Sequence, residues 1–299
     1  MQEVIVRELW TYPVKGCQGV AAEAIQISKL GIPGDRSFVL WRDGELVDQK
    51  ETPALASIGA RFDAEAGTLS FTHAQHGEYR HRVRTEGETR KAKWILDEFG
   101  TIDQGDEVAA WLTAVLGKEL RLVAPGDPWK INFPIPQMKL VHDEEKHSFF
   151  SASPVSLANV ASLDDLNRRL DKPVPMDRFR MNVVVEGLDP YQEDEIESLS
   201  NDEVSLLQVT PAERCVIVAT DQKTGDRPES DLLKKMREKP KEERFGSGRI
   251  FGSYMQVAKA GTLRVGDRLR VVSRQEIDEG ATVEDALRPL LRRLPHAAR

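Results

Sequence analysis

The chain has 299 residues, 40% of them hydrophobic and 30% charged, which is typical of a globular protein and excludes a disordered chain. Its net charge of −7 at pH 7 argues against a general nucleic-acid binder, because such a protein carries a surplus of basic residues. No apolar run approaches the roughly 18 residues of a membrane span, and the length predicts two domains or one large one.

The cysteine content bounds the redox chemistry and the compartment. Cys17 and Cys215 are the two cysteines, which excludes a disulfide scaffold and an iron–sulfur cluster held by four cysteines of this chain. The first ten residues contain two glutamates and no long apolar core, so a secretory signal is not expected. Two free thiols favour a reducing compartment, and the sequence therefore predicts the cytoplasm.

Short strand patterns dominate the first hundred residues. Each pattern is bounded by turn residues such as Asp43-Gly44, which is a hairpin signal. The expected strands cover residues 2–8, 37–41, 46–47, 67–71 and 79–83.

The middle of the chain predicts two helices and a connection. Asp106 can cap a helix that ends before Gly117, because apolar residues follow it at helical spacing. Residues 124–137 contain four prolines and are interpreted as a linker. A second helix is expected over residues 155–170, where leucines and a valine share one face.

Strand patterns return after the second helix. Strands are expected over 181–185, 204–209 and 215–220, and residues 229–244 are expected to form a solvated helix or loop. The segment 262–272 is expected to close the sheet. Turn signals every 8–12 residues are typical of barrels and sandwiches, so the fold class is mostly β (α+β), with two β-barrel-like domains and a few helices.

Cys215, which follows Arg214, is the strongest candidate for chemistry. A neighbouring cation stabilises a thiolate, and a thiolate is a nucleophile or a ligand for a soft metal. The alternative is a buried cysteine that acts as a small apolar residue.

Two glycine-rich turns each carry a basic residue. Lys15 stands between Val14 and Gly16, and Arg36 ends the turn that begins at Gly31. Backbone amides and cations in such turns can hold one anion together, although the spacing is not that of a Walker A loop. The alternative is two ordinary turns with solvated side chains.

Two further segments carry polar residues beside apolar stretches. Arg180 and Asn182 stand two residues apart at the start of an expected strand, where both would share one face. Arg180 would need an anionic partner, which would be a bound phosphate or carboxylate or, alternatively, an internal ion pair with Asp177 or with an acid of residues 191–197. Ser151 and Ser153 precede the helix expected at 155–170, whose N-terminus can bind an anion or can simply be capped.

These segments occur in one order that resembles the MOSC family, preceded by its N-terminal β-barrel domain. Within that family the chain is most similar to the molybdenum reductases of N-hydroxylated compounds, the mitochondrial amidoxime-reducing component and its bacterial relatives. The resemblance covers about residues 3–272. It is carried by YPVKGCQG, GDRSFVLW, SASPVSLANVASLDDLNRRL, RFRMNVVVEG, ERCVIVATDQKTG, FGSYMQV and GTLRVGD.

The resemblance implies a molybdenum–pyranopterin cofactor and assigns site residues to it. Cys215 matches the cysteine whose thiolate ligates molybdenum, and the implied reaction is N–O bond reduction with oxygen-atom transfer to the metal. Gly16 replaces a serine common in relatives, so its contact would come from the backbone. The residues implied to bind the cofactor are Lys15, Gly16, Arg36, Ser151, Ser153, Arg180, Asn182 and Arg214.

The resemblance also implies a domain organisation and a partner. The N-terminal barrel is expected over residues 1–124, the MOSC domain over 125–275 and a tail with a short helix over 276–299, with the site between the two domains. Electrons would come from a separate ferredoxin- or flavin-type reductase, and the substrate would be a small N-hydroxylated compound. The alternative function is a molybdenum cofactor carrier, or a sulfur-transfer protein with a persulfide on Cys215.

Overall fold

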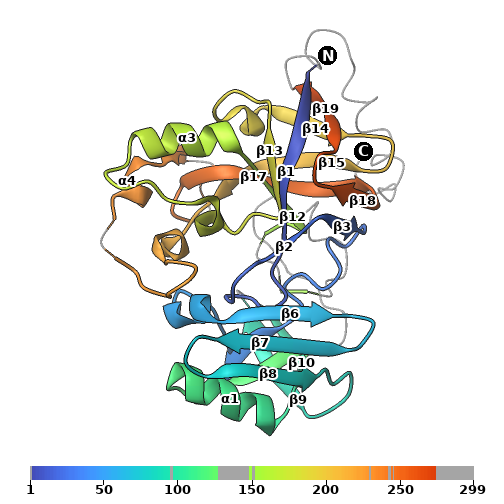
Figure 1. Ribbon diagram of the computed structural model, residues 1–299, viewed down its shortest axis with the longest axis vertical. Coiled ribbons are helices and arrows are strands. Elements are labelled where there is room, and N and C mark those ends of the chain that lie inside the picture. Colours follow the sequence, from blue (N-terminus) through green and yellow to red (C-terminus); the bar gives the residue numbers. More distant parts are fainter. Residues whose placement is uncertain are drawn as a thin grey trace.

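The computed structural model describes residues 2–94, 97–126, 148–149, 152–228, 230–241, 244 and 246–273. Most of the expected linker at 124–137 and all of the expected tail at 276–299 lie outside these residues. The described chain forms two bodies, one around each of two closed β-barrels (Figure 1). The mostly β fold class predicted from the sequence is therefore confirmed.

The larger body is a barrel of seven strands in the order β12-β13-β1-β19-β14-β15-β17, which closes because β17 also pairs with β12. Strand β2 (Val20–Ala22) extends it beside β1, and β16 (Arg237–Glu238) extends it beside β17. The barrel strands are β1 (Glu3–Thr11), β12 (Val155–Asn159), β13 (Val183–Glu186), β14 (Ile196–Ser200), β15 (Ser205–Glu213), β17 (Arg249–Lys259) and β19 (Arg268–Ser273).

The smaller body contains a five-stranded closed barrel and a separate three-stranded sheet. Helix α1 (Asp106–Leu116) packs Val108 and Leu112 into the same apolar core as Phe71 of the sheet. The barrel strands are β4 (Val39–Arg42), β5 (Glu45–Val47), β9 (Thr89–Trp94), β10 (Asp97–Asp103) and β11 (Arg121–Pro125), and the sheet strands are β6 (Gly59–Asp63), β7 (Thr68–His73) and β8 (Gly77–Arg82).

The chain enters the larger barrel before it builds the smaller one. Strand β1 pairs with β13 and β19, both of which lie more than 170 residues later in the sequence. Ile5 of β1, for example, pairs with Glu186 of β13. Strand β3 (Ala24–Ile27) likewise pairs with β18 (Gly261–Arg264). The division of the chain at residue 124 stays a prediction.

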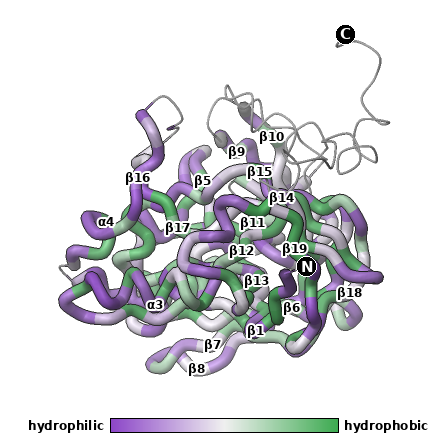
Figure 2. The backbone as a smooth tube through the Cα atoms, turned by 90° about the horizontal axis from the view of Figure 1, so that it is seen from above, coloured by the Kyte–Doolittle hydropathy of each residue, from purple (hydrophilic) through white to green (hydrophobic). Residues whose placement is uncertain are grey.

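The cores explain which apolar runs became strands. In β13, Val183 and Val185 face the interior of the larger barrel, and Val184 faces an outer cluster under helix α3 (Val160–Arg168). Burial on both faces accounts for the continuous apolar run of this strand. Figure 2 shows the same pattern, with hydrophobic residues along central strands such as β17 and hydrophilic residues along the β7–β8 edge.

The helix expected over residues 155–170 is wrong in its first third. Val155–Asn159 forms β12, which is fully buried between β13 and β17, and the helix begins only at Val160. A short apolar run fits a buried strand and a helix equally well. Here the run is a strand, because it pairs with both β13 and β17 and so closes the barrel. The N-cap of α3 is Asn159, whose Oδ1 accepts from the Ala161 amide.

The strand expected over residues 215–220 is also wrong. Residues Val216–Ala219 form the 3-10 turn η4, with i to i+3 hydrogen bonds from Val218 to Cys215 and from Thr220 to Ile217. Only Val218 of this turn is buried, in the outer cluster of the larger barrel. The segment expected to be solvated at 229–244 contains helix α4 (Leu232–Lys235), and its Leu232 and Met236 are buried there as well.

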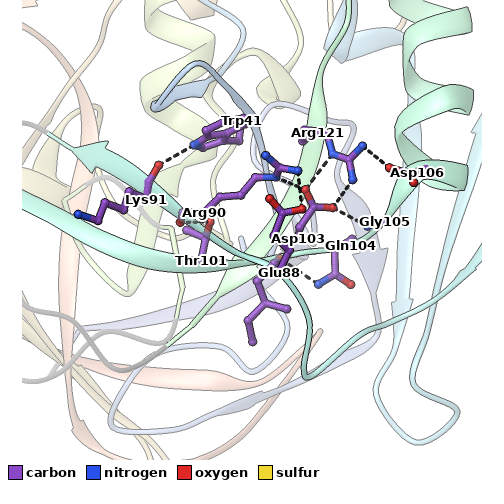
Figure 3. Close-up of polar contacts among 11 residues, drawn as sticks. Trp41, Glu88, Arg90, Lys91, Thr101, Asp103, Gln104, Gly105, Asp106 and Arg121 are labelled. Carbon is purple, nitrogen blue, oxygen red and sulfur yellow. Dashed lines mark hydrogen bonds and ion pairs between the residues drawn. The ribbon is translucent and has the colours of Figure 1, made fainter.

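An ion-pair network braces the smaller barrel where β9, β10 and β11 meet (Figure 3). Asp103, at the end of β10, is buried and receives both Arg90 and Arg121; Arg121 Nη2 lies 2.6 Å from Asp103 Oδ1. The Gly105 amide also donates to Asp103 Oδ1, at 2.7 Å, and so directs the chain into α1. A buried carboxylate with these partners is fully hydrogen-bonded.

Candidate functional site

A cavity of about 680 Å³ lies between the two barrels and collects most of the residues singled out in the sequence. Its wall includes residues of the smaller barrel such as Leu46 and residues of the larger barrel such as Tyr254. Ser151 lies outside the described residues. The predicted site residues that line the cavity are Lys15, Gly16, Arg36, Ser153, Arg180, Asn182, Arg214 and Cys215.

Cys215 stands at the turn between β15 and η4. Its thiol is free and partly exposed, so it is open to a ligand, in contrast to a core cysteine. The side chain of Arg214, beside it, donates to the carbonyls of Phe251 at 2.9 Å and Phe179 at 3.2 Å. Burial lowers the pKa of the Arg214 guanidinium. A soft sulfur ligand and a partly buried cation therefore adjoin the same cavity.

The turns that carry Lys15 and Arg36 lie side by side. Val14 forms a parallel bridge with Phe38, and the Arg36 amide donates to the Tyr12 carbonyl at 2.7 Å. The Lys15 ammonium donates to the Phe149 carbonyl at 3.2 Å, and burial lowers the pKa of Lys15 to about 7. A bound anion would favour the charged form of this amine.

Gly16 is required by its backbone conformation and by its neighbours. It has φ +94°, which side-chain-bearing residues rarely adopt, and an added Cβ would lie 3.0 Å from Leu55 Cδ1. Its carbonyl accepts from the Gln49 side chain. The sequence predicted a backbone contact to the ligand here, and that contact stays a prediction.

The ring of Tyr12 contacts two of the arginines that line the cavity. The guanidinium carbons of Arg36 and Arg180 each lie 4.4 Å from the centre of the Tyr12 ring. Arg36 also pairs with Asp35 and donates to the carbonyl of Arg180 at 3.0 Å. Two cations gathered on one ring repel each other, and an anion between them would relieve this repulsion.

Arg180 and Asn182 meet the cavity for a different reason from the one that their spacing predicted. Arg180 is not in the strand: it has φ 54°, in the left-handed region, and precedes Asn182 and then β13. Its Nη1 donates to Gln222 Oε1 at 2.8 Å, and burial lowers the pKa of Arg180 to about 10. Among the described residues no carboxylate forms an ion pair with Arg180, so the predicted alternative of an internal pair, with Asp177 or with an acid of residues 191–197, is not what holds it.

Asn182 lines the cavity together with Ser153 and Ser156, which lie just before and within β12. Asn182 Oδ1 accepts from the Ser156 hydroxyl at 2.9 Å and from Arg36 Nη1 at 3.2 Å. Ser153 donates its hydroxyl to the Met255 carbonyl. Neither alternative for a helix N-terminus, an anion site or a cap, applies at Ser153, because Ser153 precedes a strand and not a helix.

Cys17 and the acidic segment at residues 189–197 do not line the cavity. Cys17 is fully buried in the core of the smaller barrel, where burial raises its pKa to about 12. Within the acidic segment, Glu193 is buried and accepts from the Ser162 hydroxyl at 2.7 Å.

Comparison with known proteins matches both halves of this architecture. The model of the MOSC domain matches residues 144–270, and the model of the MOSC N-terminal beta barrel domain matches residues 3–119. Mitochondrial amidoxime-reducing component 1 of Homo sapiens is 30% identical over 273 residues, which cover 88% of this chain and 81% of that protein.

This chain belongs to the MOSC family of the amidoxime-reducing components.

Further similar proteins include a second amidoxime-reducing component and one solved structure. Mitochondrial amidoxime reducing component 2 of Bos taurus is 29% identical, over 88% of this chain and 81% of that one. The crystal structure of the YUAD protein from Bacillus subtilis covers 91% of this chain and 97% of its own, with 13% identity and a TM-score of 0.43. In the described part of this MOSC chain, no helix combines the length and apolar character that a membrane crossing requires.

Sequence reasoning missed several residues that line this MOSC cavity or contact the residues lining it. Tyr12 and Gln222 stand inside two of the quoted motifs, so their position there was the available signal. Gln49 stands in no quoted motif, and only the fold brings it to Gly16 and Gln222. Arg178, which pairs with Asp221 at 2.8 Å, also lines the cavity.

Proposed function

We propose that this MOSC-family chain is a molybdenum cofactor-dependent reductase of small N-hydroxylated compounds. One observation carries the proposal: the partly exposed Cys215 lines the same cavity as the partly buried cations Lys15, Arg36 and Arg180. The names of the relatives in human and cattle, which are amidoxime-reducing components, support the same reaction class.

The residues present fit a pyranopterin cofactor. A thiolate is a suitable ligand for molybdenum, which prefers sulfur donors of this kind. Partly buried arginines and a lysine suit an anionic phosphate end, because a charge withdrawn from water is costly unless it is paired. The cavity of about 680 Å³ is also within the range of roughly 300–1,000 Å³ common for small-molecule and cofactor sites.

Each residue has a distinct task in this proposal. The Cys215 sulfur would hold the metal, and Lys15, Arg36, Arg180 and the backbone of Gly16 would hold the anionic end. When bound, the cofactor supplies the two-electron redox chemistry. The remaining residues implied by the family resemblance, which would orient the ring system, are Ser151, Ser153, Asn182 and Arg214.

The overall reaction defines what else is needed. Conversion of a hydroxylamine or an amidoxime into the amine or amidine consumes two electrons and two protons and releases one water. The Lys15 Nζ, whose pKa is lowered to about 7 by burial, holds a proton more firmly once an anion lies beside it. The electrons come from a separate ferredoxin- or flavin-type reductase.

Substitution of Cys215 tests the proposal. The parent, Cys215→Ala and Cys17→Ala are made in a host that synthesises the cofactor, and molybdenum per chain and amidoxime reduction with a dye donor are measured. Cys215→Ala is expected to lose reduction by at least about 100-fold, because alanine cannot ligate a metal. Cys17→Ala is expected to keep most of the activity, since its thiol lies in a core.

The alternatives give different results. Equal activity of Cys215→Ala and the parent would refute the proposal. Molybdenum in the parent without any turnover would point instead to a cofactor carrier, and absence of metal with a persulfide on Cys215 to sulfur transfer.

A further inference from the structure

Two buried glutamines, Gln49 and Gln222, join the barrels beside the cavity. Their side-chain amides bond reciprocally: Gln49 Nε2 donates to Gln222 Oε1 at 3.0 Å, and Gln222 Nε2 donates to Gln49 Oε1 at 3.1 Å. Gln49 is fully buried and Gln222 is 6% exposed. The pair links residues 173 positions apart, one following β5 and the other following η4.

The two side-chain amides make further hydrogen bonds to Gly16, Thr220 and Arg180. Gln49 Nε2 also donates to the carbonyl of Gly16, and Gln222 Nε2 to the carbonyl of Thr220 at 3.0 Å. Gln222 Oε1 accepts a second hydrogen bond, from Arg180 Nη1 at 2.8 Å. The pair thus connects the lysine turn, the left-handed arginine and the segment after Cys215.

Arg180 differs from two neighbouring arginines in what holds it. Arg36 is paired with Asp35, and Arg178 is paired with Asp221. Arg180 is held by the neutral amide of Gln222 and by the face of Tyr12. A carboxylate in place of the amide would neutralise the guanidinium in a site where charges are weakly screened. An amide fixes its direction and leaves its charge in place.

We propose that Gln222, supported by Gln49, is a positioning residue that orients Arg180 and keeps its positive charge available to the anionic end of the bound ligand. This inference rests on the proposed function for the identity of that ligand. The anion site itself can be tested with inorganic phosphate, whatever the cofactor is.

The substitution Gln222→Glu is the sharpest test. The glutamate has nearly the same shape and can still accept from Arg180, but it adds a charge that pairs with the guanidinium. Gln222→Met keeps the length without polar groups. Gln75→Glu, in the exposed β7–β8 turn, adds the same charge away from the cavity and serves as the control.

Two readouts separate this inference from the proposed function. The first is molybdenum and pterin content per chain, before and after prolonged dialysis, for protein from a cofactor-producing host. The second is the dissociation constant for inorganic phosphate, by titration calorimetry on full-length protein from a host without the cofactor. Thermal unfolding midpoints check that each variant is folded.

Gln222→Glu is expected to weaken phosphate binding about tenfold, since a charge-assisted hydrogen bond is lost, and to shorten cofactor retention correspondingly. Gln222→Met should weaken binding less, by about threefold, because Arg180 loses its direction but keeps its charge. Gln75→Glu should match the parent. If Gln222→Glu does not fold, the Gln222→Met result decides.

Parental phosphate affinity in Gln222→Glu, or an equal loss in Gln222→Met and Gln222→Glu, would overturn the inference, because charge at this position would then be irrelevant. A parent without molybdenum would refute the proposed function alone, and the phosphate titration would still decide the role of Gln222.

Discussion

At the scale of single residues, the site depends on backbone conformations that few residues tolerate. Gly16 has φ +94° and Arg36 and Arg180 also have positive φ, so three of the segments that meet the cavity turn through the left-handed region. Such conformations cost about 1 kcal/mol or more for residues with a Cβ and are held by the surrounding contacts. Here the contacts are Tyr12, Gln49 and Gln222.

Gly16→Ala tests this requirement. The added Cβ is strained by φ and also meets Leu55 Cδ1 at 3.0 Å, whereas Gly44, with φ +90°, has nothing within 4 Å. Gly44→Ala therefore serves as a control for the φ penalty alone. We expect Gly16→Ala to lower the free energy of unfolding by about 1 kcal/mol more than Gly44→Ala does, in denaturant titrations. Equal losses would show that Leu55 yields without cost.

At the scale of elements, the network around Asp103 joins β9, β10, β11 and α1 of the smaller barrel (Figure 3). Burial of Asp103 alone would raise the pKa of its carboxyl, but hydrogen bonds from Arg121, Arg90 and the Gly105 amide outweigh burial and lower the pKa to about 2. This value is below that of the unfolded chain, about 3.9. The stabilisation is therefore complete above about pH 5 and is lost as the pH falls toward 2.

Asp103→Asn should remove this pH dependence. The difference in free energy of unfolding between the parent and Asp103→Asn is expected to shrink by about 1 kcal/mol from pH 6 to pH 3. At pH 3 the Asp103 carboxylate of the folded parent is still mostly charged, whereas the Asp103 carboxyl of the unfolded parent is mostly protonated. Denaturant titrations at several pH values measure it. Asp43→Asn, at an exposed turn, should show a nearly constant difference. A constant difference for Asp103→Asn would mean that the ion pairs of Asp103 in the parent do not contribute to the free energy of unfolding.

At the scale of the whole molecule, the cavity lies between two barrels, and the chain passes from one barrel to the other twice. Strand β1 starts in the larger barrel, the smaller barrel follows, and β12 to β19 complete the larger one (Figure 1). Long-range contacts such as the glutamine pair and the Arg227 bond to the Gln49 carbonyl hold the bodies against each other. A ligand in the cavity would therefore contact residues of both barrels.

A separate reductase is expected to supply the electrons of the proposed reaction. The sequence contains no Gly-x-Gly-x-x-Gly nucleotide loop, so the purified chain should reduce an amidoxime with a dye donor and should show less than about 1% of that rate with NADH alone. Steady-state rates with each donor, for the parent and for Cys215→Ala, measure this. Robust NADH-dependent turnover by the isolated parent would refute the need for a partner.

The sequence by itself determined the β-rich class, the order of motifs and most of the candidate residues that line the cavity. Alternating patterns at 2–8 and 67–71 became strands, because each packs one face on a core and period two is legible in a few residues. Cys215 beside Arg214 and the basic residues in glycine turns could be found because each signal lies within a few neighbouring residues.

Only the tertiary structure decided which apolar runs are helical and which distant residues meet. Val155–Asn159 became a strand, although the run fits a helix, because the barrel closes through its pairing with β17. Gln222 reached Gln49 across 173 positions, and no local pattern encodes such a pairing. Hydrophobic periodicity reports the environment of one segment, whereas barrel closure and the glutamine contacts depend on segments that meet only after the chain has folded.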